Sequence, residues 1–328
     1  MSSVVVVTKR IDQVRAHPNA DRLEIVIVGG WQTVVPKGLY SVGSQVTYVP
    51  PDCVVPPALA ERWGIAKYLS NGRVRATKLR GEASYGFVVP AEGKPGENLA
   101  AALGITKWQP PAKFGVGDAE PEHPLFTRYT DVENMRHFPS TFAQGELVQI
   151  AEKVHGVNVR IALIDGQRYA GSRTMQRKHA EDSIYWHAWA IPAVVQAMER
   201  LNACATHAAV LYGEVYGRVQ TLTYGRPDDI AFVAFDASID GKYLDAQDLR
   251  SALDNVPLVP LIEGAIPLNL DNVAACSRGP SMMPGARHIR EGVVVRPLRE
   301  RWDPAIGRVI LKYVSDDYLT GDYDAASE

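Results

Sequence analysis

The sequence predicts an α+β protein in which a small N-terminal β-barrel precedes a larger domain of strands and flanking helices. Three observations support this prediction. The first 90 residues contain short β-branched runs separated by turn residues. Residues 91–124 are rich in glycine and proline, as in a linker or a long ordered loop. The remaining residues mix strand-like runs with one clear helical pattern.

The N-terminal runs predict five or six short strands. They are Val4–Val7, Leu23–Val28, Thr33–Val35, Gln45–Val49, Val74–Leu79 and Gly86–Val89. So many short strands in so few residues favour a small barrel of the OB type, which protects strand edges. We therefore expect an OB-type domain over residues 1–90, a linker over 91–124 and a second domain over 125–328.

The clearest helix of the second domain is expected over Ala193–Asn202, where apolar residues recur at helical spacing. The residues on this apolar face are Val194, Val195, Met198 and Leu201. We interpret this stripe as core packing. The short polar tail 320–328 is expected to fray.

Composition excludes several classes of protein. The chain has 328 residues, 46% of them hydrophobic, and a formal net charge of −2, so any contact with nucleic acid must come from a local basic patch. Its three isolated cysteines disfavour a disulfide framework or a structural zinc site. Because we find no signal peptide and no apolar run of membrane-spanning length, we expect a cytoplasmic protein without a membrane partner.

Lys153 is the first candidate for a catalytic residue. It follows the apolar run 147–150 and stands two residues before the pair His155-Gly156. Free lysine has a pKa of about 10.4, so a nucleophilic lysine needs nearby cations, or a metal on the phosphate, to lower that pKa. Gly156 is expected to let the backbone approach a ligand closely.

A Lys-x-x-Gly pattern has little weight by itself, and a second one occurs at Lys78 and Gly81. Four segments downstream of Lys153 distinguish it. They are Gly-Ser-Arg-Thr at 171–174, Tyr-Gly-Glu-Val-Tyr-Gly at 212–217, Glu-Gly-Val-Val-Val-Arg-Pro at 291–297 and Val-Ile-Leu-Lys-Tyr at 309–313. Taken singly, such an acid is usually part of a turn and such a lysine reaches solvent. Taken together, they supply the cations and carboxylates that nucleotidyl transfer requires.

In this order the segments resemble the covalent nucleotidyltransferases, which comprise ATP-dependent polynucleotide ligases and mRNA capping enzymes. The form of the lysine motif with His155 and Asn158 is similar to that of nick-sealing RNA ligases. The N-terminal OB-type domain and the closing residues 312–319 resemble the deinococcal-type branch. The resemblance implies a nucleotidyltransferase domain (an ATP-grasp-like ligase adenylation domain) of antiparallel sheets with flanking helices.

The resemblance also implies a role for each motif residue. Lys153 would attack the α-phosphate of ATP and hold AMP, and Arg173 would contact the ribose and the incoming 5′-phosphate. Glu214 would bind the ribose hydroxyls. Phe235 would stack on adenine, with Asp236 supporting the site.

Further residues complete the implied site. Glu291 would hold Mg²⁺ or Mn²⁺ with the help of Glu214. Lys312 would neutralise the α-phosphate and lower the pKa of Lys153. The other residues expected around the nucleotide are Glu152, His155, Gly156 and Asn158.

Two features depart from related ligases. Where another branch carries Lys-x-Lys in its last motif, the second position here is Val314, so Lys312 would carry the charge alone or share it with Arg296. The chain also ends soon after this motif, so the N-terminal domain would have to grip the nick.

The best local phosphate patch lies in 73–80, where basic residues at i and i+2 would share a strand face. Its residues are Arg73, Arg75, Lys78 and Arg80. A solvated basic strand is the alternative interpretation.

We therefore predict an ATP-dependent RNA ligase that joins 3′-OH and 5′-phosphate RNA ends at nicks in duplexes, through a lysyl-AMP intermediate and an adenylylated 5′ end. ATP, Mg²⁺ or Mn²⁺, a nicked RNA duplex and a monomeric state are the expected cofactors, substrate and assembly. Two alternatives remain at this stage, a GTP-dependent capping-type guanylyltransferase and a non-catalytic RNA-binding OB protein. The nucleotide found in the covalent adduct would separate the first alternative from a ligase.

Overall fold

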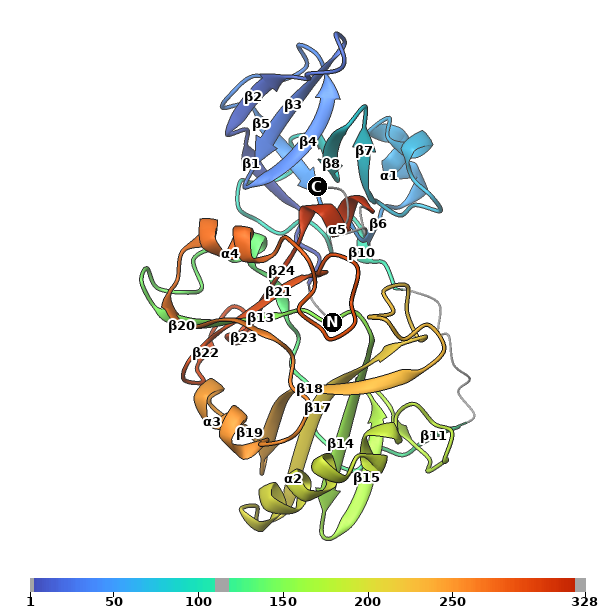
Figure 1. Cartoon of the computed structure of the whole chain (residues 1–328). Helices are drawn as coiled ribbons and strands as arrows, with labels where there is room; N and C mark the ends of the chain where they lie inside the picture. Colours follow the sequence, from blue (N-terminus) through green and yellow to red (C-terminus); the bar gives the residue numbers. More distant parts are fainter. Residues whose placement is uncertain (1–2, 110–117, 322–328) are drawn as a thin grey trace. The chain divides into compact units, whose positions relative to one another are not determined.

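The computed structural model describes residues 3–109 and 118–321 (Figure 1). The chain divides into two compact units. Unit 1 comprises Met1–Ala112 with two short later segments, Arg136–Phe138 and Leu319–Gly321, and unit 2 comprises the rest. Part of the predicted linker, 110–117, and most of the predicted frayed tail, 322–328, lie outside the described residues.

Unit 1 is built from short antiparallel strands. They are β1 (Val7–Arg10), β2 (Gln13–Ala16), β3 (Leu23–Val28), β4 (Trp31–Pro36), β5 (Gln45–Val49), β6 (Cys53–Val54), β7 (Ala76–Leu79), β8 (Glu82–Tyr85), β9 (Phe87–Pro90) and β10 (Thr106–Lys107). In the described part they form sheets in the orders β1-β5-β9, β2-β3-β4, β7-β8 and β10-β6. Helix α1 (Pro57–Arg62) and the 3₁₀ helix η1 (Ala66–Tyr68) follow β6. Trp31 and Tyr48 stack in one core of this unit, with ring centroids 6.0 Å apart.

The prediction of a strand over Val4–Val7 was wrong in its limits, because β1 begins at Val7. The backbone of Val6 is bonded elsewhere: its N–H donates to Asn98 Oδ1 at 3.1 Å and its C=O accepts from Leu99 N–H at 2.7 Å. Strands β2 and β8 were not predicted. Both carry polar residues at alternate positions, so their apolar runs are too short to stand out.

Unit 2 contains the two larger sheets. One has the order β11-β16-β15-β14-β17-β18-β19 and the other β12-β24-β21-β13-β20. The strands of the first are β11 (Ala119–Glu120), β14 (Val157–Ile164), β15 (Gln167–Ser172), β16 (Gln176–Arg177), β17 (Ala208–Gly217), β18 (Ile230–Ile239) and β19 (Lys242–Tyr243). The strands of the second are β12 (Glu133–Asn134), β13 (Leu147–Glu152), β20 (Leu261–Pro267), β21 (Gly292–Pro297) and β24 (Leu311–Val314). Pairing is antiparallel except between β12 and β24.

The helices and a small hairpin complete this unit. They are η3 (Met135–His137), η4 (His187–Ala190), α2 (Pro192–Ala203), α3 (Ala246–Ala252), α4 (Leu270–Cys276), α5 (Asp316–Thr320) and the pair β22 (Trp302–Asp303) and β23 (Gly307–Arg308). The division between units falls inside η3 and α5. Helix α2 confirms the predicted helix, and it begins with Pro192, whose fixed φ suits the first helical turn. None of the helices in the described ranges is long and apolar enough to cross a bilayer.

Helix α2 covers one face of the seven-stranded sheet, beside β14 and β17 (Figure 1). Its buried residues Val194 and Met198 share a core with Leu211 of β17. On the opposite face, Tyr212 of β17 shares a second core with Ile310, which directly precedes β24. This second face therefore packs toward the five-stranded sheet, and the candidate site lies on that side.

Candidate active site

A cavity of about 280 Å³ lies within unit 2, between the strands of its two sheets. Its lining from the five-stranded sheet and the residues next to it comprises Gln149, Ala151, Glu152, Lys153, Val154, Val294, Arg296, Ile310 and Lys312. Its lining from the seven-stranded sheet and neighbouring segments comprises Tyr129, Thr130, Val132, Asn158, Arg173, Glu214, Phe235, Leu249, Arg250, Leu258 and Val259. The structure thus brings Lys153, Asn158, Arg173, Glu214, Phe235 and Lys312 to one cavity, as the motif order implied.

Lys153 follows the last residue of β13 and is held there by its backbone, whose N–H donates to Gly292 O at 2.9 Å. Its side chain is 27% exposed, and Nζ lies 2.8 Å from Glu291 Oε1. Burial lowers the pKa of Lys153, but Glu291 and Glu214 outweigh burial and raise it above its ordinary value. The expectation that cations depress this pKa is therefore wrong for the nucleotide-free protein, where the nearest charges are carboxylates.

Glu291 lies directly before β21 and contacts two residues of the lysine motif. Its Oε2 lies 3.4 Å from His155 Nδ1, and its Oε1 is the atom that meets Lys153. Burial opposes ionisation of Glu291, but Lys153 and His155 outweigh burial and lower its pKa to about 2. Glu291 is therefore ionised at neutral pH.

His155 stands beside the cavity and does not line it. Its backbone N–H donates to the hydroxyl of Tyr224 at 2.6 Å, and its Nδ1 lies 3.2 Å from the hydroxyl of Tyr318. With the Glu291 contact, two contacts hold this imidazole next to the carboxylate that holds Lys153, and the Tyr224 contact holds its backbone.

Glu214 is in the middle of β17, directly opposite Asn158 of β14 in the strand register. Burial raises the pKa of Glu214 to about 8, and the neighbouring Glu291 adds to this rise. Lys153 lowers the same pKa, but its effect is smaller than that of burial. In the nucleotide-free protein, one of the two carboxyls around Lys153 is therefore ionised and the other is mostly protonated near pH 7.

These two carboxyls fit a divalent cation. No cluster of three or more His, Cys, Asp or Glu side chains with metal-ligand spacing occurs in residues 3–109 and 118–321. Mg²⁺, however, commonly uses one or two carboxylates and completes its shell with water and substrate phosphates. Glu214 and Glu291 offer such a pair, and a carboxyl whose pKa is raised by burial and a like charge is one that a bound cation would ionise.

Gly156 allows a close approach within the protein. A Cβ at this position would lie 2.3 Å from Val215 O and 2.7 Å from Glu214 Cγ. Glycine is thus required because β17 passes close by. The consequence is that Gly156 fixes the position of Glu214.

Glu152 was predicted to bind the nucleotide, but its carboxylate is already engaged. It accepts hydrogen bonds from Ser281 Oγ at 2.5 Å and from Met282 N–H at 2.7 Å. Burial raises the pKa of Glu152. Glu152 lines the cavity together with Ala151 and Lys153, but its carboxylate is held by residues 281–282.

A β-bulge positions Phe235. In the pairing of β17 with β18, Tyr212 is opposite Asp236 and Gly213 is opposite Ala234, which leaves Phe235 as the extra residue. Because of the bulge, Phe235 and Asp236 can both face the cavity side although they are consecutive. Bulges often redirect side chains in this way beside active sites.

Behind Phe235, Asp236 is the centre of a buried ionic cluster. It lies 2.7 Å from Arg308 and 3.3 Å from Arg296, and it accepts a hydrogen bond from the Tyr129 hydroxyl at 2.8 Å. Arg296 also meets Glu300 at 2.8 Å. The charge of Arg296 is therefore already balanced, so sharing phosphate neutralisation with Lys312 is not the role that its contacts favour.

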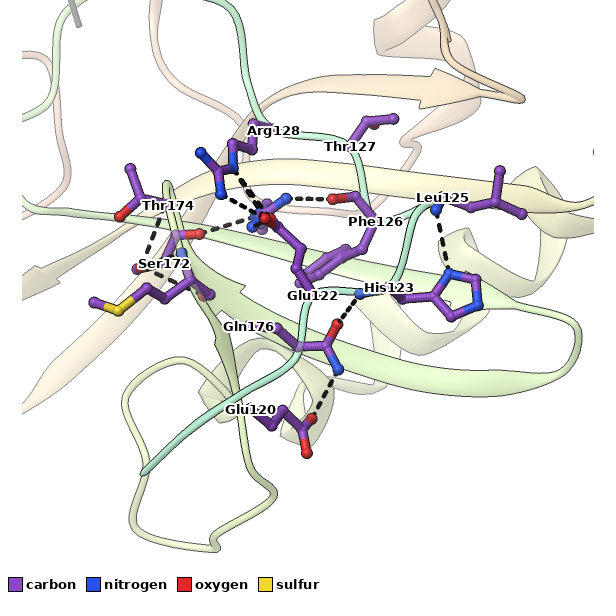
Figure 2. A network of polar contacts seen from close by, with 12 residues as sticks. Glu120, Glu122, His123, Leu125, Phe126, Thr127, Arg128, Ser172, Thr174 and Gln176 are labelled. Carbon is purple, nitrogen blue, oxygen red and sulfur yellow. Dashed lines mark hydrogen bonds and ion pairs between the residues drawn. The ribbon is translucent and has the colours of Figure 1, made fainter. Parts of the chain in front are cut away.

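Arg173 follows β15 and forms an ion pair with Asp131. The chain leading to Asp131 is anchored by a polar network (Figure 2). In it, Gln176 Nε2 donates to Glu120 at 2.8 Å and Glu122 accepts from Arg128 at 2.6 Å. This network holds the segment that carries Tyr129 and Thr130 to the cavity wall.

The deepest anchor of this segment is Arg160 of β14, whose side chain is 0% exposed. Its guanidinium donates to Glu122, to Phe126 O and to Ser172 O, the last at 2.9 Å. A charge buried in this way must be paired, and here the pairing ties the incoming segment to two strands.

The predicted basic strand face in unit 1 was wrong in part. Only Lys78 lies within β7, whereas Arg73 and Arg75 precede that strand and Arg80 occupies a turn with φ of +50°. Arg73 meets Asp52 at 2.6 Å and stacks on Trp108 at 3.3 Å, so its charge is used within the unit. Arg75, Lys78 and Arg80 are exposed.

Sequence reasoning missed more than half of the cavity lining. The residues missed were Tyr129, Thr130, Val132, Gln149, Ala151, Val154, Leu249, Arg250, Leu258, Val259, Val294 and Ile310. For Gln149 and Ala151 a signal existed, because alternate residues of one strand share a face with Lys153. The α3 residues and the loop after them carry no such signal, since tertiary packing alone brings them to the cavity.

With this geometry established, comparison with known proteins places the chain. The sequence profile of the RNA ligase family matches residues 146–314, more than half of the chain, and an OB-fold domain profile matches residues 5–91. The chain belongs to the RNA ligase family and carries an N-terminal OB fold. No curated protein sequence matches it.

Solved structures of an RNA ligase from Naegleria gruberi share the fold. A variant with ATP and Mn is 23% identical, with a TM-score of 0.79 over 96% of this chain and 98% of that chain. A form with pyrophosphate is 22% identical, with a TM-score of 0.77 over 97% and 98%. A form with AMP and Mn is 23% identical, with a TM-score of 0.78 over 96% and 98%. The predicted fold class, an OB domain followed by a ligase domain of mainly antiparallel sheets with few helices, is confirmed.

Proposed function

We propose that this RNA ligase uses ATP and Mg²⁺ or Mn²⁺ to join 3′-OH and 5′-phosphate RNA ends. The observation that carries the proposal is the convergence of Lys153, Glu214, Phe235 and Lys312 on one cavity. This set combines a nucleophile, a group for ribose hydroxyls, an aromatic ring for a base and a cation for phosphate. The Naegleria enzyme, whose structures contain ATP, AMP, pyrophosphate and Mn, supports the choice of ligands.

Three steps follow from these residues. The Lys153 ammonium first loses a proton; Nζ then attacks the α-phosphorus of ATP, the N–P bond forms, and the bond to pyrophosphate breaks. An RNA 5′-phosphate oxygen next attacks the same phosphorus and releases Lys153. The RNA 3′-OH finally attacks the activated 5′-phosphate, loses its proton and expels AMP. All three are phosphoryl transfers, which depend on positioning and charge neutralisation.

The residues of the cavity have separate tasks in these steps. Glu214 would bind the ribose hydroxyls, Phe235 would stack on the base, and Lys312 would neutralise the α-phosphate. Arg173 would exchange its partner Asp131 for the incoming 5′-phosphate. A divalent cation held by Glu291 and Glu214 would supply charge neutralisation for the phosphates. Its arrival would also weaken the hold of Glu291 on Lys153.

We further propose that the substrate is a nicked duplex, as in the deinococcal-type branch. Support comes from His155 and Asn158 in the lysine motif and from the N-terminal OB domain. We also propose that the enzyme acts as a monomer in the cytoplasm.

The test is a covalent-adduct assay. The protein is incubated with α-labelled ATP and Mg²⁺ or Mn²⁺, denatured and examined for label, with GTP in parallel. We expect label from ATP in the wild type and in Lys78→Ala, a matched Lys-x-x-Gly lysine of unit 1, and none in Lys153→Ala. Label that persists in Lys153→Ala, or that comes from GTP alone, would contradict the proposal. Intact mass first shows whether the protein was purified already adenylylated.

A further inference from the structure

The two ends of the cavity differ in chemistry. Around Lys153 the lining is polar, with Glu214 and Asn158. Around Phe235 it is mostly apolar, and the residues there include Leu249, Leu258 and Val259. Val259 N–H donates to Ala234 O at 3.0 Å, which places this apolar wall directly beside Phe235. Under the proposed function, the phosphates belong at the first end and the base at the second.

Gln149 lies at the base end. It precedes Lys153 by four residues, and both line the cavity, so their Cα atoms are about 13 Å apart along β13. Its partner in the strand register is Arg296, and Arg296 contacts Asp236, the residue after Phe235. Ala151, the only residue between Gln149 and Lys153 on this face, is small and leaves room for a long side chain.

The Gln149 amide is a polar group at the base end whose contacts leave it available. In residues 3–109 and 118–321 it has no hydrogen-bond partner, and the residue is half-buried. The two guanidinium groups nearby are engaged. Arg296 is bound by Asp236, Glu300 and Leu244 O, and Arg250 donates to Val259 O at 3.2 Å.

A glutamine amide presents one acceptor and one donor side by side. Adenine offers the matching pair, the exocyclic amine as donor and a neighbouring ring nitrogen as acceptor. Guanine offers two acceptors at the corresponding edge, O6 and N7, which suit arginine better. Gln149 therefore matches adenine and leaves one guanine acceptor without a partner.

Building on the proposed function, we propose that Gln149 recognises the adenine ring, accepts a hydrogen bond from its exocyclic amine, and so makes the enzyme select ATP over GTP. Gln149 is then the specificity-determining residue at the base end of the cavity. Lys153 and Glu214 act on parts that all ribonucleotides share.

The test removes the same hydrogen bond from either side. Adduct formation is followed by intact mass with ATP, GTP and purine riboside triphosphate, which lacks the exocyclic amine. Wild type is expected to react about 10-fold more slowly with purine riboside triphosphate than with ATP, the usual size of one neutral hydrogen bond. With GTP the loss should reach about 100-fold, since a buried polar group is left unpaired.

The variant is Gln149→Met, which keeps the length of the side chain and removes its hydrogen bonding. It should react with ATP and purine riboside triphosphate at rates within about 3-fold of each other. Gln149→Glu, which keeps the acceptor, should retain the preference for the exocyclic amine. Gln167→Met, an exposed strand position outside the cavity, is the matched control and should behave as wild type.

Three results separate the possibilities. If Gln149→Met keeps the wild-type preference for ATP, Gln149 does not read the base. If wild type itself does not distinguish ATP from purine riboside triphosphate, the inference also fails, even when no variant folds. If wild type forms no adduct at all, the proposed function fails. Equilibrium dialysis with ATP then tests the inference separately from adduct formation. Base recognition by Gln149 requires wild type to bind ATP more tightly than Gln149→Met does.

Discussion

Lys153 is held as an ammonium by its neighbours in the nucleotide-free protein. Glu291 at 2.8 Å stabilises the charged form and, with Glu214, raises the lysine pKa. Under the proposed mechanism, this arrangement would keep Lys153 unreactive until a nucleotide and a cation occupy the cavity. It also makes the pH dependence of the first step a direct readout of Glu291.

We expect Glu291→Gln to shift the acid limb of the adenylylation profile to lower pH by about 1 unit or more, because removing a carboxylate disfavours the ammonium. The maximal rate should fall as well, so the measured quantity is the position of the limb. Glu214→Gln is the comparison: Glu291 contacts Nζ directly and raises the lysine pKa more than Glu214 does, so the limb should move less. An unchanged limb in Glu291→Gln would show that Glu291 does not set the lysine pKa.

The contributions of Glu291 and Glu214 to the free energy of unfolding depend on pH in opposite ways. Lys153 and His155 overcome burial and lower the pKa of Glu291 from 4.5 to about 2, so its contribution is present above pH 4.5 and is lost as pH falls through about 2. Burial raises the pKa of Glu214 from 4.5 to about 8, so its contribution is present below pH 4.5 and is lost as pH rises through about 8.

At the scale of elements, the site depends on how closely β14 and β17 approach. Gly156, just before β14, allows this contact because any Cβ would collide with Val215 O. We expect Gly156→Ala to destabilise unit 2 by about 1–3 kcal/mol, as overpacking does, and to slow adenylylation at least about 10-fold by displacing Glu214.

Thermal unfolding and adduct formation measure the two effects separately. Gly264→Ala in β20 is the matched control, since nothing lies within 4 Å of its added Cβ, and both quantities should stay unchanged. Normal stability together with normal adenylylation in Gly156→Ala would show that the strands have room to separate.

The elements also show what the sequence could predict. Strands β3 and β5 and helix α2 followed from apolar periodicity, and ordered motifs located Lys153 and Glu214. The bulge that places Phe235 beside Asp236 could not be predicted, since it arises from the register of two paired strands. Nor could the binding of Glu152 by residues 281–282, because that contact joins segments far apart in the chain.

At the scale of the whole molecule, the cavity lining comes entirely from unit 2, whereas the exposed basic residues Arg75, Lys78 and Arg80 belong to unit 1. We expect the triple alanine variant of these residues to form the ATP adduct at the wild-type rate and to bind nicked RNA more weakly. The slope of log affinity against log salt concentration should fall by about 0.7–0.9 for each RNA phosphate that the variant no longer neutralises.

The measurements are adduct formation and RNA binding over a range of salt concentrations. Lys37→Ala, an exposed lysine of unit 1 outside this group, should leave the slope unchanged. If the triple variant keeps the wild-type salt slope, these residues do not bind RNA phosphates.

The composition of unit 1 bears on how the protein is made. Its core around Trp31 includes the Arg136 guanidinium, 4.4 Å from that ring, and it is joined by Leu319, almost the last residue described. During synthesis, N-terminal domains generally fold first, at about 5–20 residues added per second. Here the core of unit 1 also needs Arg136 and Leu319, so the N-terminal unit is completed only after residues 139–318 of unit 2 have been added.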